Sequence, residues 1–99
     1  MTAYFVVRAV VAETDRRDFD TWYRTEHLPD AIKAFNAATG WRAWSRTDPG
    51  VHYAFYQFPN LAAAEAVTRS AAIGRLVAEF DARWGERVAR TREIIETAE

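Results

Sequence analysis

The residues best suited to proton transfer lie close together in the sequence: Tyr23, Glu26 and His27. At about 100° per residue, a helix would place them on one face with Phe19 and Trp22. In the last turn of a helix, the dipole favours the charged imidazole of His27, whereas burial favours the neutral ring. These opposing effects can leave a histidine titrating near neutral pH, so we predict that His27 is a general acid or base.

Tyr23 and Glu26 are predicted to act with His27 on the same ligand. Tyr23 lies one helical turn earlier, where its hydroxyl can donate a proton or stabilise an oxyanion. Glu26 projects near the centre of the apolar stripe, and a carboxylate there must be paired, hydrogen-bonded or open to a water-filled pocket. It would orient the substrate or act as a base with a raised pKa.

Each of these roles has a simpler alternative. His27 could bond to free carbonyls at the end of the helix. Glu26 could reach solvent or an arginine if the helix frays or bends at this turn. Tyr23 and Trp22 could be core residues, because aromatic side chains at helical spacing are usually buried.

Four aromatic residues are predicted to line a ligand pocket: Trp22, Trp44, Tyr53 and Phe80. The aromatic residues of the predicted strands divide between the pocket and a dimer interface by alternation, and the sequence does not decide which set faces which: Trp44, Tyr53, Phe55 and Tyr56. His52 follows a turn at residues 48–50, which predicts a surface position for its ring.

Other kinds of site are not indicated. His27, His52 and Glu26 could be the ligands of a metal ion only if the fold brought them together. No HExxH-type spacing is present, so we predict no metal site. Arg90 and Arg92 share one face of a strand, which we interpret as a solvated edge rather than a grip on an acidic ligand. The sequence contains no glycine-rich phosphate loop.

Composition excludes several classes of function. The 99 residues, 49% hydrophobic and 27% charged, predict one domain over residues 1–99. The absence of cysteine excludes disulfides, thiolate nucleophiles and cysteine-bound metals. A net charge of -1 argues against a nucleic-acid binder. No apolar run approaches the roughly 20 residues of a membrane span, and no secretory signal is visible, so we expect a cytoplasmic protein without a membrane partner.

Hydrophobic periodicity and turn residues predict the elements that position these side chains. Strands are expected at residues 4–13, 41–46, 52–58 and 88–96, and helices at 16–27, 30–35, 60–69 and 70–84. Pro29 is expected to break the first helix, on which Asp20 points away from the apolar face. Candidate caps are Thr14-Asp15, Asn60, Ser70 and Gly85. The β-α-β-β-α-β order predicts an α+β fold, a ferredoxin-like split βαβ sandwich with an antiparallel four-stranded sheet.

Both faces of the predicted sheet are apolar, although helices can cover only one of them. In the first strand Tyr4, Val6 and Val10 lie on one face, and Phe5 and Val7 on the other. The uncovered face would form an apolar patch of a kind that monomers rarely expose. We therefore predict a homodimer with the two sheets packed face to face about a two-fold axis. The alternative is that these side chains are tolerated singly at the surface.

Three segments resemble the dimeric α+β barrel superfamily: Phe19-x-x-Trp22-Tyr23-x-x-Glu26-His27-Leu28-Pro29, Gly40-Trp41-x-Ala43-x-x-Arg46 and Tyr53-x-x-Tyr56-x-Phe58. They are most similar to its EthD-like branch and to branches related to antibiotic-biosynthesis monooxygenases. The superfamily also includes muconolactone isomerases, aromatic polyketide cyclases and haem-degrading enzymes. The resemblance implies a ligand pocket between the inner sheet face and the helices, and it implies aromatic or lactone substrates. The proline that often precedes the glycine of the second strand is replaced by Ala38-Thr39.

The leading hypothesis is a small dimeric enzyme that acts on an aromatic or apolar metabolite. It would work without a cofactor, as an isomerase, a cyclase or a monooxygenase, and no cofactor is assigned. A non-catalytic protein that binds or senses such a molecule is one alternative. A structural dimerisation module with a filled core is another, which the absence of any cavity beside His27 would favour.

Overall fold

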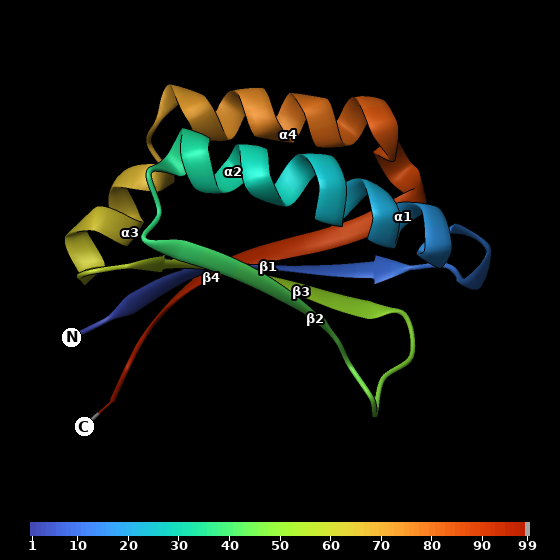
Figure 1. Cartoon of the computed structure of the whole chain (residues 1–99), viewed down its shortest axis with the longest axis horizontal. Helices are drawn as coiled ribbons and strands as arrows, with labels where there is room; N and C mark the ends of the chain where they lie inside the picture. The colour runs from blue at the N-terminus through green and yellow to red at the C-terminus, as the bar shows by residue number, and fades with distance from the viewer. Residues whose placement is uncertain (99) are drawn as a thin grey trace.

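The computed structural model describes residues 1–98 as one antiparallel four-stranded sheet with helices on one side (Figure 1). Glu99, the last residue of the predicted domain, lies outside the described residues. The strands are β1 (Ala3–Val11), β2 (Thr39–Trp44), β3 (Val51–Phe58) and β4 (Val88–Glu96). The helices are α1 (Arg16–Trp22), α2 (Leu28–Phe35), α3 (Leu61–Val67) and α4 (Ala71–Arg83), with short segments η1 (Glu13–Asp15), η2 (Tyr23–His27) and η3 (Gly85–Arg87). The predicted α+β, ferredoxin-like fold is confirmed, with the sheet order β2-β3-β1-β4.

Alternation along the strands gives the sheet a helix-covered face and an open face. The register sets Phe5 of β1 opposite Tyr56 of β3 and Ile94 of β4. Phe5 and Tyr56 are each 1% exposed beneath the helices. Tyr53 and Phe55 lie on the open face and are partly exposed. The division of residues between two faces therefore follows the predicted alternation.

The helix that carries the predicted site residues does not break at Pro29, so that prediction is wrong. The chain runs from α1 through η2, a π-helical turn, into α2 without leaving helical backbone angles. Leu28 has φ −63° and ψ −50°, and its N–H donates to the carbonyl of Tyr23. The wide turn carries the chain into α2 with Pro29 in the first turn, where its missing N–H costs little.

Three of the four predicted helix caps are present. The side chains of Asn60 and Ser70 each accept a hydrogen bond from the backbone N–H three residues later, at 2.9 and 3.3 Å. Gly85 follows α4 with φ +54°, a left-handed conformation that favours glycine. Asp15 makes no capping hydrogen bond. Its carboxylate pairs instead with Arg87 at 3.1 Å.

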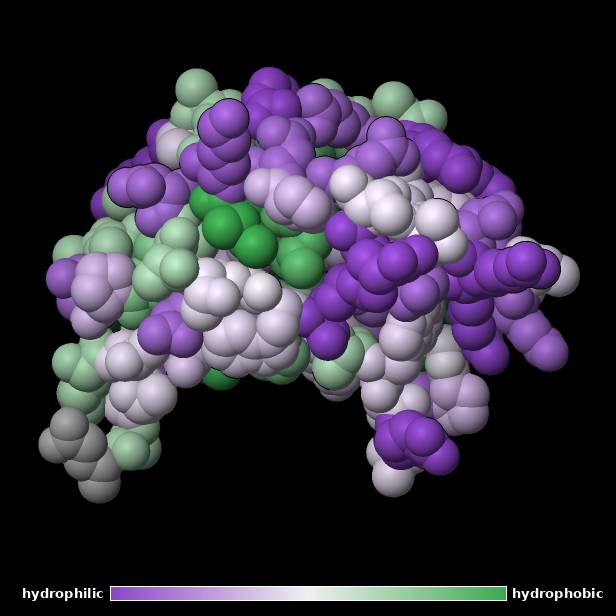
Figure 2. All heavy atoms as spheres, viewed as in Figure 1, coloured by the Kyte–Doolittle hydropathy of each residue, from purple (hydrophilic) through white to green (hydrophobic). Residues whose placement is uncertain are grey.

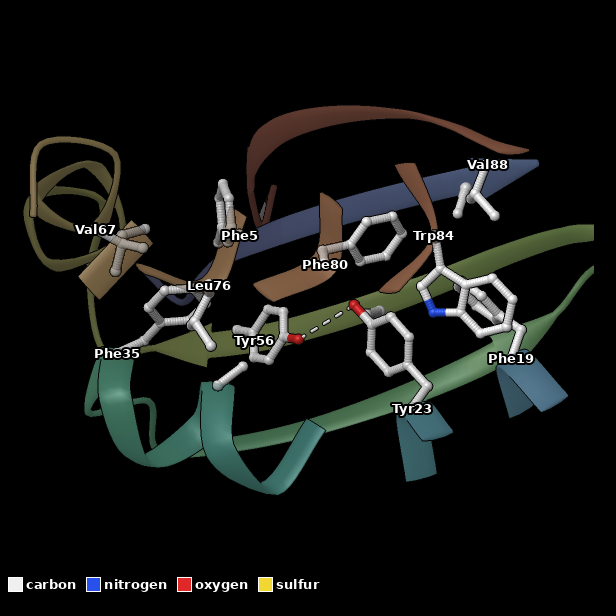
Figure 3. Close-up of a cluster of buried hydrophobic side chains, with 14 of the residues drawn as sticks. Phe5, Phe19, Tyr23, Phe35, Tyr56, Val67, Leu76, Phe80, Trp84 and Val88 are labelled. Carbon is white, nitrogen blue, oxygen red and sulfur yellow. Dashed lines mark hydrogen bonds between the residues drawn. The ribbon is translucent and has the colours of Figure 1, made fainter. Parts of the chain in front are cut away.

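The core lies between the helix-covered face and helices α1, α2, α3 and α4, and several of its aromatic rings are drawn in Figure 3. Phe19, Phe80 and Trp84 meet there, and each is at most 2% exposed. Gly40 of β2 lets α2 approach closely, since a Cβ at this position would lie 2.7 Å from Cγ1 of Ile32. This close packing holds the helical segment with Tyr23 and its neighbours against the sheet.

The open face carries a row of aromatic side chains, which we call the open-face row: Tyr4, Trp41, Tyr53 and Phe55. Trp41 stacks on Phe55 with ring centroids 5.7 Å apart, and Phe55 stacks on Tyr53 at 6.1 Å. Tyr4 meets Trp41 edge-on at 5.5 Å. Figure 2 shows a hollow beneath this side of the sheet, between the β2–β3 hairpin and the chain ends. Among residues 1–98, no helix has the length and apolar character needed to cross a membrane.

Candidate functional site

A narrow pocket lies between α4 and the helix-covered face, next to η2. Its lining includes Phe5, Tyr23, His27, Tyr56, Phe80 and Arg90. The empty space is about 310 Å³ with the open mouth included. The enclosed part has room for about one water molecule. A larger ligand would have to move side chains or lie towards the mouth.

The structure places His27 in the lining of this pocket, with 8% of the residue exposed. Its ring stacks on the indole of Trp22, with centroids 4.6 Å apart. Burial lowers the pKa of His27 from 6.5 to about 4, although the charge of Asp30 opposes the shift. The expected titration near neutral pH is therefore wrong, because the helix continues past His27 and no helix end is there to favour the imidazolium. The ring is neutral at physiological pH and can accept a proton.

Two buried tyrosine hydroxyls face one another in the same pocket (Figure 3). The hydroxyl oxygens of Tyr23 and Tyr56 lie 3.4 Å apart, close enough for one to donate to the other. Burial raises the pKa of Tyr23 to about 12 and also raises the pKa of Tyr56. Both phenols therefore remain protonated and can donate. Tyr56 was one of the strand aromatics that the sequence left divided between the pocket and the dimer interface, and it was not named as a site residue. Its spacing of two from Phe58 is the sequence signal that the two share a face.

Glu26 lies outside the pocket, on the exposed surface of η2. Tyr23 and His27 of η2 are both buried, and the widened π turn leaves Glu26 on the solvent side. Glu26 borders a separate hollow beside η2, which Trp22, His27, Asp30 and Glu79 also line. This placement agrees with the alternative in which Glu26 reaches solvent. Trp22 is partly buried and is not part of the pocket lining, but its indole stacks on the imidazole of His27.

The other predicted pocket aromatics lie in three different places. Phe80 of α4 lines the pocket, with its ring centroid 5.8 Å from that of His27. Trp44 faces the helices at the other end of the core, where its Nε1 donates to Asp20 at 2.8 Å. Tyr53 lies on the open face and does not line this pocket, because the alternation of β3 turns the even-numbered residues towards the helices.

His52 is buried, contrary to its predicted surface position. It is 1% exposed, and its ring centroid lies 5.1 Å from that of Phe19 and 4.9 Å from that of Trp44. Nη1 of Arg42 lies 3.4 Å from Nε2 of His52 and donates to Asp20 at 2.7 Å. Burial, followed by the charge of Arg42, lowers the pKa of His52 to about 4. Asp20 points towards the sheet, contrary to expectation, because it accepts the hydrogen bonds of this network.

The two histidines are not brought together as metal ligands. The ring of Tyr23 contacts both, with centroid distances of 4.8 Å to His27 and 4.7 Å to His52. Glu26 lies on the outer surface. Among residues 1–98, no group of three or more His, Cys, Asp or Glu side chains is placed to hold a metal ion.

Solved structures share this architecture, although no family model and no curated protein matches the sequence. An EthD family protein from Bacillus halodurans C-125 has a TM-score of 0.76 at 14% identity, over 99% of this chain and 100% of that chain. A NIPSNAP family protein from Agrobacterium tumefaciens has a TM-score of 0.74 at 7% identity, over 99% and 94% of the two chains. SnoaB, a cofactor-independent oxygenase from Streptomyces nogalater, has a TM-score of 0.67 at 9% identity, over 99% and 94%.

The chain shares its α+β, ferredoxin-like fold with these solved structures. The resemblance inferred from the segment around Trp22 and His27 is thereby confirmed at the level of the fold. The pocket also includes two arginines that were expected at a solvated edge. Arg90 and Arg92 both line the pocket, and the side chain of Arg90 is only 11% exposed. The expectation fails for Arg90 because its guanidinium is covered by Phe80 of α4.

Proposed function

We propose that this protein binds an aromatic or otherwise apolar metabolite between α4 and the sheet and transforms it by acid/base chemistry without a cofactor. The reaction classes are isomerisation, cyclisation and oxygenation. One observation carries the proposal: the neutral imidazole of His27 faces the same apolar pocket as the paired hydroxyls of Tyr23 and Tyr56. Burying polar groups costs free energy, so a core selected only for packing would favour apolar side chains at these positions.

His27 acts as the base in this mechanism. Its neutral ring accepts a proton from an acidic C–H or O–H group of the ligand. The indole of Trp22, stacked at 4.6 Å, stabilises the imidazolium that forms. The carboxylate of Asp30 acts in the same direction, because its charge raises the pKa of His27.

Tyr23 assists by donating a hydrogen bond to the negative oxygen that develops as the ligand loses its proton. Its pKa of about 12 keeps the phenol protonated for this task. In an isomerisation or cyclisation, His27 returns the proton to the product. In an oxygenation, the deprotonated carbon reacts with molecular oxygen, and a CH2 group and O2 give C=O and water. The oxygenation branch is supported by SnoaB, a cofactor-independent oxygenase with the same fold.

A homodimer is the second part of the proposal. Val10, Trp41 and Ile95 of the open face are 44%, 41% and 40% exposed. Trp41 belongs to the open-face row, and Ile95 of β4 lies opposite Tyr4 of that row, so apolar side chains extend across the strands of this face. A second copy packed on this face about a two-fold axis would remove that surface from water.

A non-catalytic binding protein is the second candidate, and the distribution of free space favours it. An outer hollow of about 730 Å³, with its open mouth included, is bordered by Ile73, Val77 and Ile94, between α4 and β4. The enclosed pocket at His27 has room for about one water molecule. A ligand held only in the outer hollow would not contact His27. It would stabilise the protein and be recovered unchanged.

The catalytic proposal is tested by a thermal-melt screen against aromatic acids, quinones and haem, with product analysis for each compound that raises the Tm. For a converted compound, we expect His27→Gln to lower kcat by about 100-fold or more. His52→Gln is the matched control, because it replaces a second buried histidine outside the pocket lining. Unchanged turnover by a folded His27→Gln dimer would remove His27 from the mechanism. Ligands recovered unchanged throughout would favour the binding protein.

The dimer is tested by sedimentation at micromolar concentration. We expect the wild-type chain to sediment as a dimer and Trp41→Asp to sediment as a folded monomer, because the charge would be buried within the apolar interface. Arg46→Asp, at an exposed position after β2, is the control and should remain dimeric. A wild-type chain that sediments as a single subunit would contradict the proposed assembly.

A further inference from the structure

Two arginines stand side by side on the wall of the pocket formed by β4. Arg90 and Arg92 are two residues apart on this edge strand and both line the pocket. The register sets them opposite Ala9 and Val7 of β1. These two neighbours have short side chains, which leave the guanidiniums space above the sheet.

Arg90 is held in place but only partly neutralised. Its guanidinium carbon lies 3.9 Å from the ring centroid of Phe80, and its side chain is 11% exposed. Its Nη2 pairs with Asp81 at 3.2 Å, but the Asp81 side chain is 58% exposed and therefore largely hydrated. A guanidinium has five N–H donors, so this single contact leaves most of them available.

Arg92 is closer to solvent and is not neutralised within the described chain. It borders both the inner pocket and the outer hollow, so it stands where the two spaces join. Among residues 1–98, no carboxylate lies within ion-pair distance of Arg92. Burial and the neighbouring charge of Arg92 lower the pKa of Arg90, a sign that the two positive charges repel one another.

The rest of the inner pocket provides no balancing negative charge. Within residues 1–98, no Asp or Glu belongs to its lining. Burial keeps His27 uncharged and both tyrosines protonated. Glu93 borders the outer hollow, but it occupies the alternate position on β4, on the side of the open face. The lining therefore holds a positive charge that an anion would neutralise.

We propose that Arg90 and Arg92 bind an anionic group, so that the ligand of this pocket is an aromatic or apolar acid. A carboxylate fits best, because a guanidinium binds its two oxygens with two parallel N–H bonds. The anionic group lies at the β4 edge, where the inner pocket and the outer hollow meet, and the apolar body extends towards His27 and Tyr23. This inference rests on the proposed function, since it names the class of ligand for the same site.

The test is calorimetric titration of the wild-type protein with matched pairs of probes: benzoate and benzamide, 2-naphthoate and 2-naphthamide, and 2-anthroate and its amide. Within a pair, shape is nearly constant and only the charge changes. We expect at least one carboxylate to bind about 10-fold more tightly than its amide, the size expected for hydrogen bonds to a charged group. Arg92→Gln should abolish most of this preference and leave the affinity for the amide unchanged.

Arg17→Gln is the matched control, because it removes the same charge from an exposed position on α1. It should keep the preference for the carboxylate. Equal binding of acid and amide by the wild type, or an undiminished preference in Arg92→Gln, would overturn this inference and leave the apolar pocket of the proposed function standing. If neither member of any pair binds at millimolar concentration, the proposed function is overturned as well. Arg92 is chosen because it is exposed, so its replacement spares the packing of Arg90 on Phe80.

Discussion

His27 and His52 both contact the ring of Tyr23, and burial lowers the pKa of each to about 4. The remaining neighbours differ. We call the surroundings of His52 the network end of the core, where Arg42 and Asp20 join it in a chain of polar contacts. We call the surroundings of His27 the pocket end, where aromatic side chains surround the imidazole and the pocket opens beside it.

The comparison shows that a shifted pKa alone does not mark a functional histidine. At the network end, Asp20 accepts from both Arg42 and Trp44, at 2.7 and 2.8 Å, so the polar groups bond to one another and support the fold. At the pocket end, the positive charge of the arginines is only partly balanced, and the base faces an opening. The open space and the partly balanced charge distinguish the second region, which is why we propose the function there.

Acid should have the largest effect on stability. Both histidines are neutral in the folded protein but bind protons near pH 6.5 when unfolded, so the stability present above pH 6.5 falls as the pH drops towards 4. The loss amounts to about 3 kcal/mol for each histidine. Urea denaturation at several pH values gives the free energy of unfolding as a function of pH. This pH dependence should be weaker in His27→Gln and in His52→Gln than in the wild type. If the double variant loses stability in acid as steeply as the wild type, the two histidines are not the cause of the acid sensitivity.

Disrupting the polar network around His52 should have the second-largest effect on stability. Asp20→Ala removes the acceptor of Arg42 and of Trp44, and we expect it to lower the free energy of unfolding by about 2 kcal/mol. Asp30→Ala is the control at the pocket end, where the partner Arg75 is 48% exposed, so its cost should stay below about 1 kcal/mol. If urea denaturation shows the same loss of free energy of unfolding in Asp20→Ala and Asp30→Ala, the polar contacts at the two ends of the core do not differ in their contribution to stability.

Glu26→Gln should have the smallest effect. The side chain is exposed and lies outside the pocket, so we expect the free energy of unfolding to change by less than about 0.5 kcal/mol. Turnover of an identified substrate should also stay unchanged. A large loss of turnover would place the ligand in the hollow beside η2, which both Glu26 and His27 border.

Much of the fold follows from local pattern. The bounds of β4 match the prediction, and the bounds of β3 differ by a single residue. The caps at Asn60, Ser70 and Gly85 were recognisable because each depends on the residue and its immediate neighbours. The apolar character of both sheet faces is likewise a property of the alternation in β1.

The site was only partly predictable. A constant helical period places Glu26 in the buried stripe, and the π turn of η2 breaks that period. Pro29, taken from the sequence as a helix break, is where the helix resumes its regular form. The burial of His52 and Arg90 could not be predicted, because the side chains that cover them come from other segments of the chain. These are Phe19 of α1 for His52 and Phe80 of α4 for Arg90.

Residue order and type therefore settled the elements, the two apolar faces and the candidacy of His27 and Tyr23, because these depend on periodicities of a few residues. The packing of α4 over the edge strand decided which face encloses the pocket and which arginines enter it. It also decided which histidine is closed in by polar partners. Contacts across the layers join residues from different elements, and no spacing along the chain contains that information.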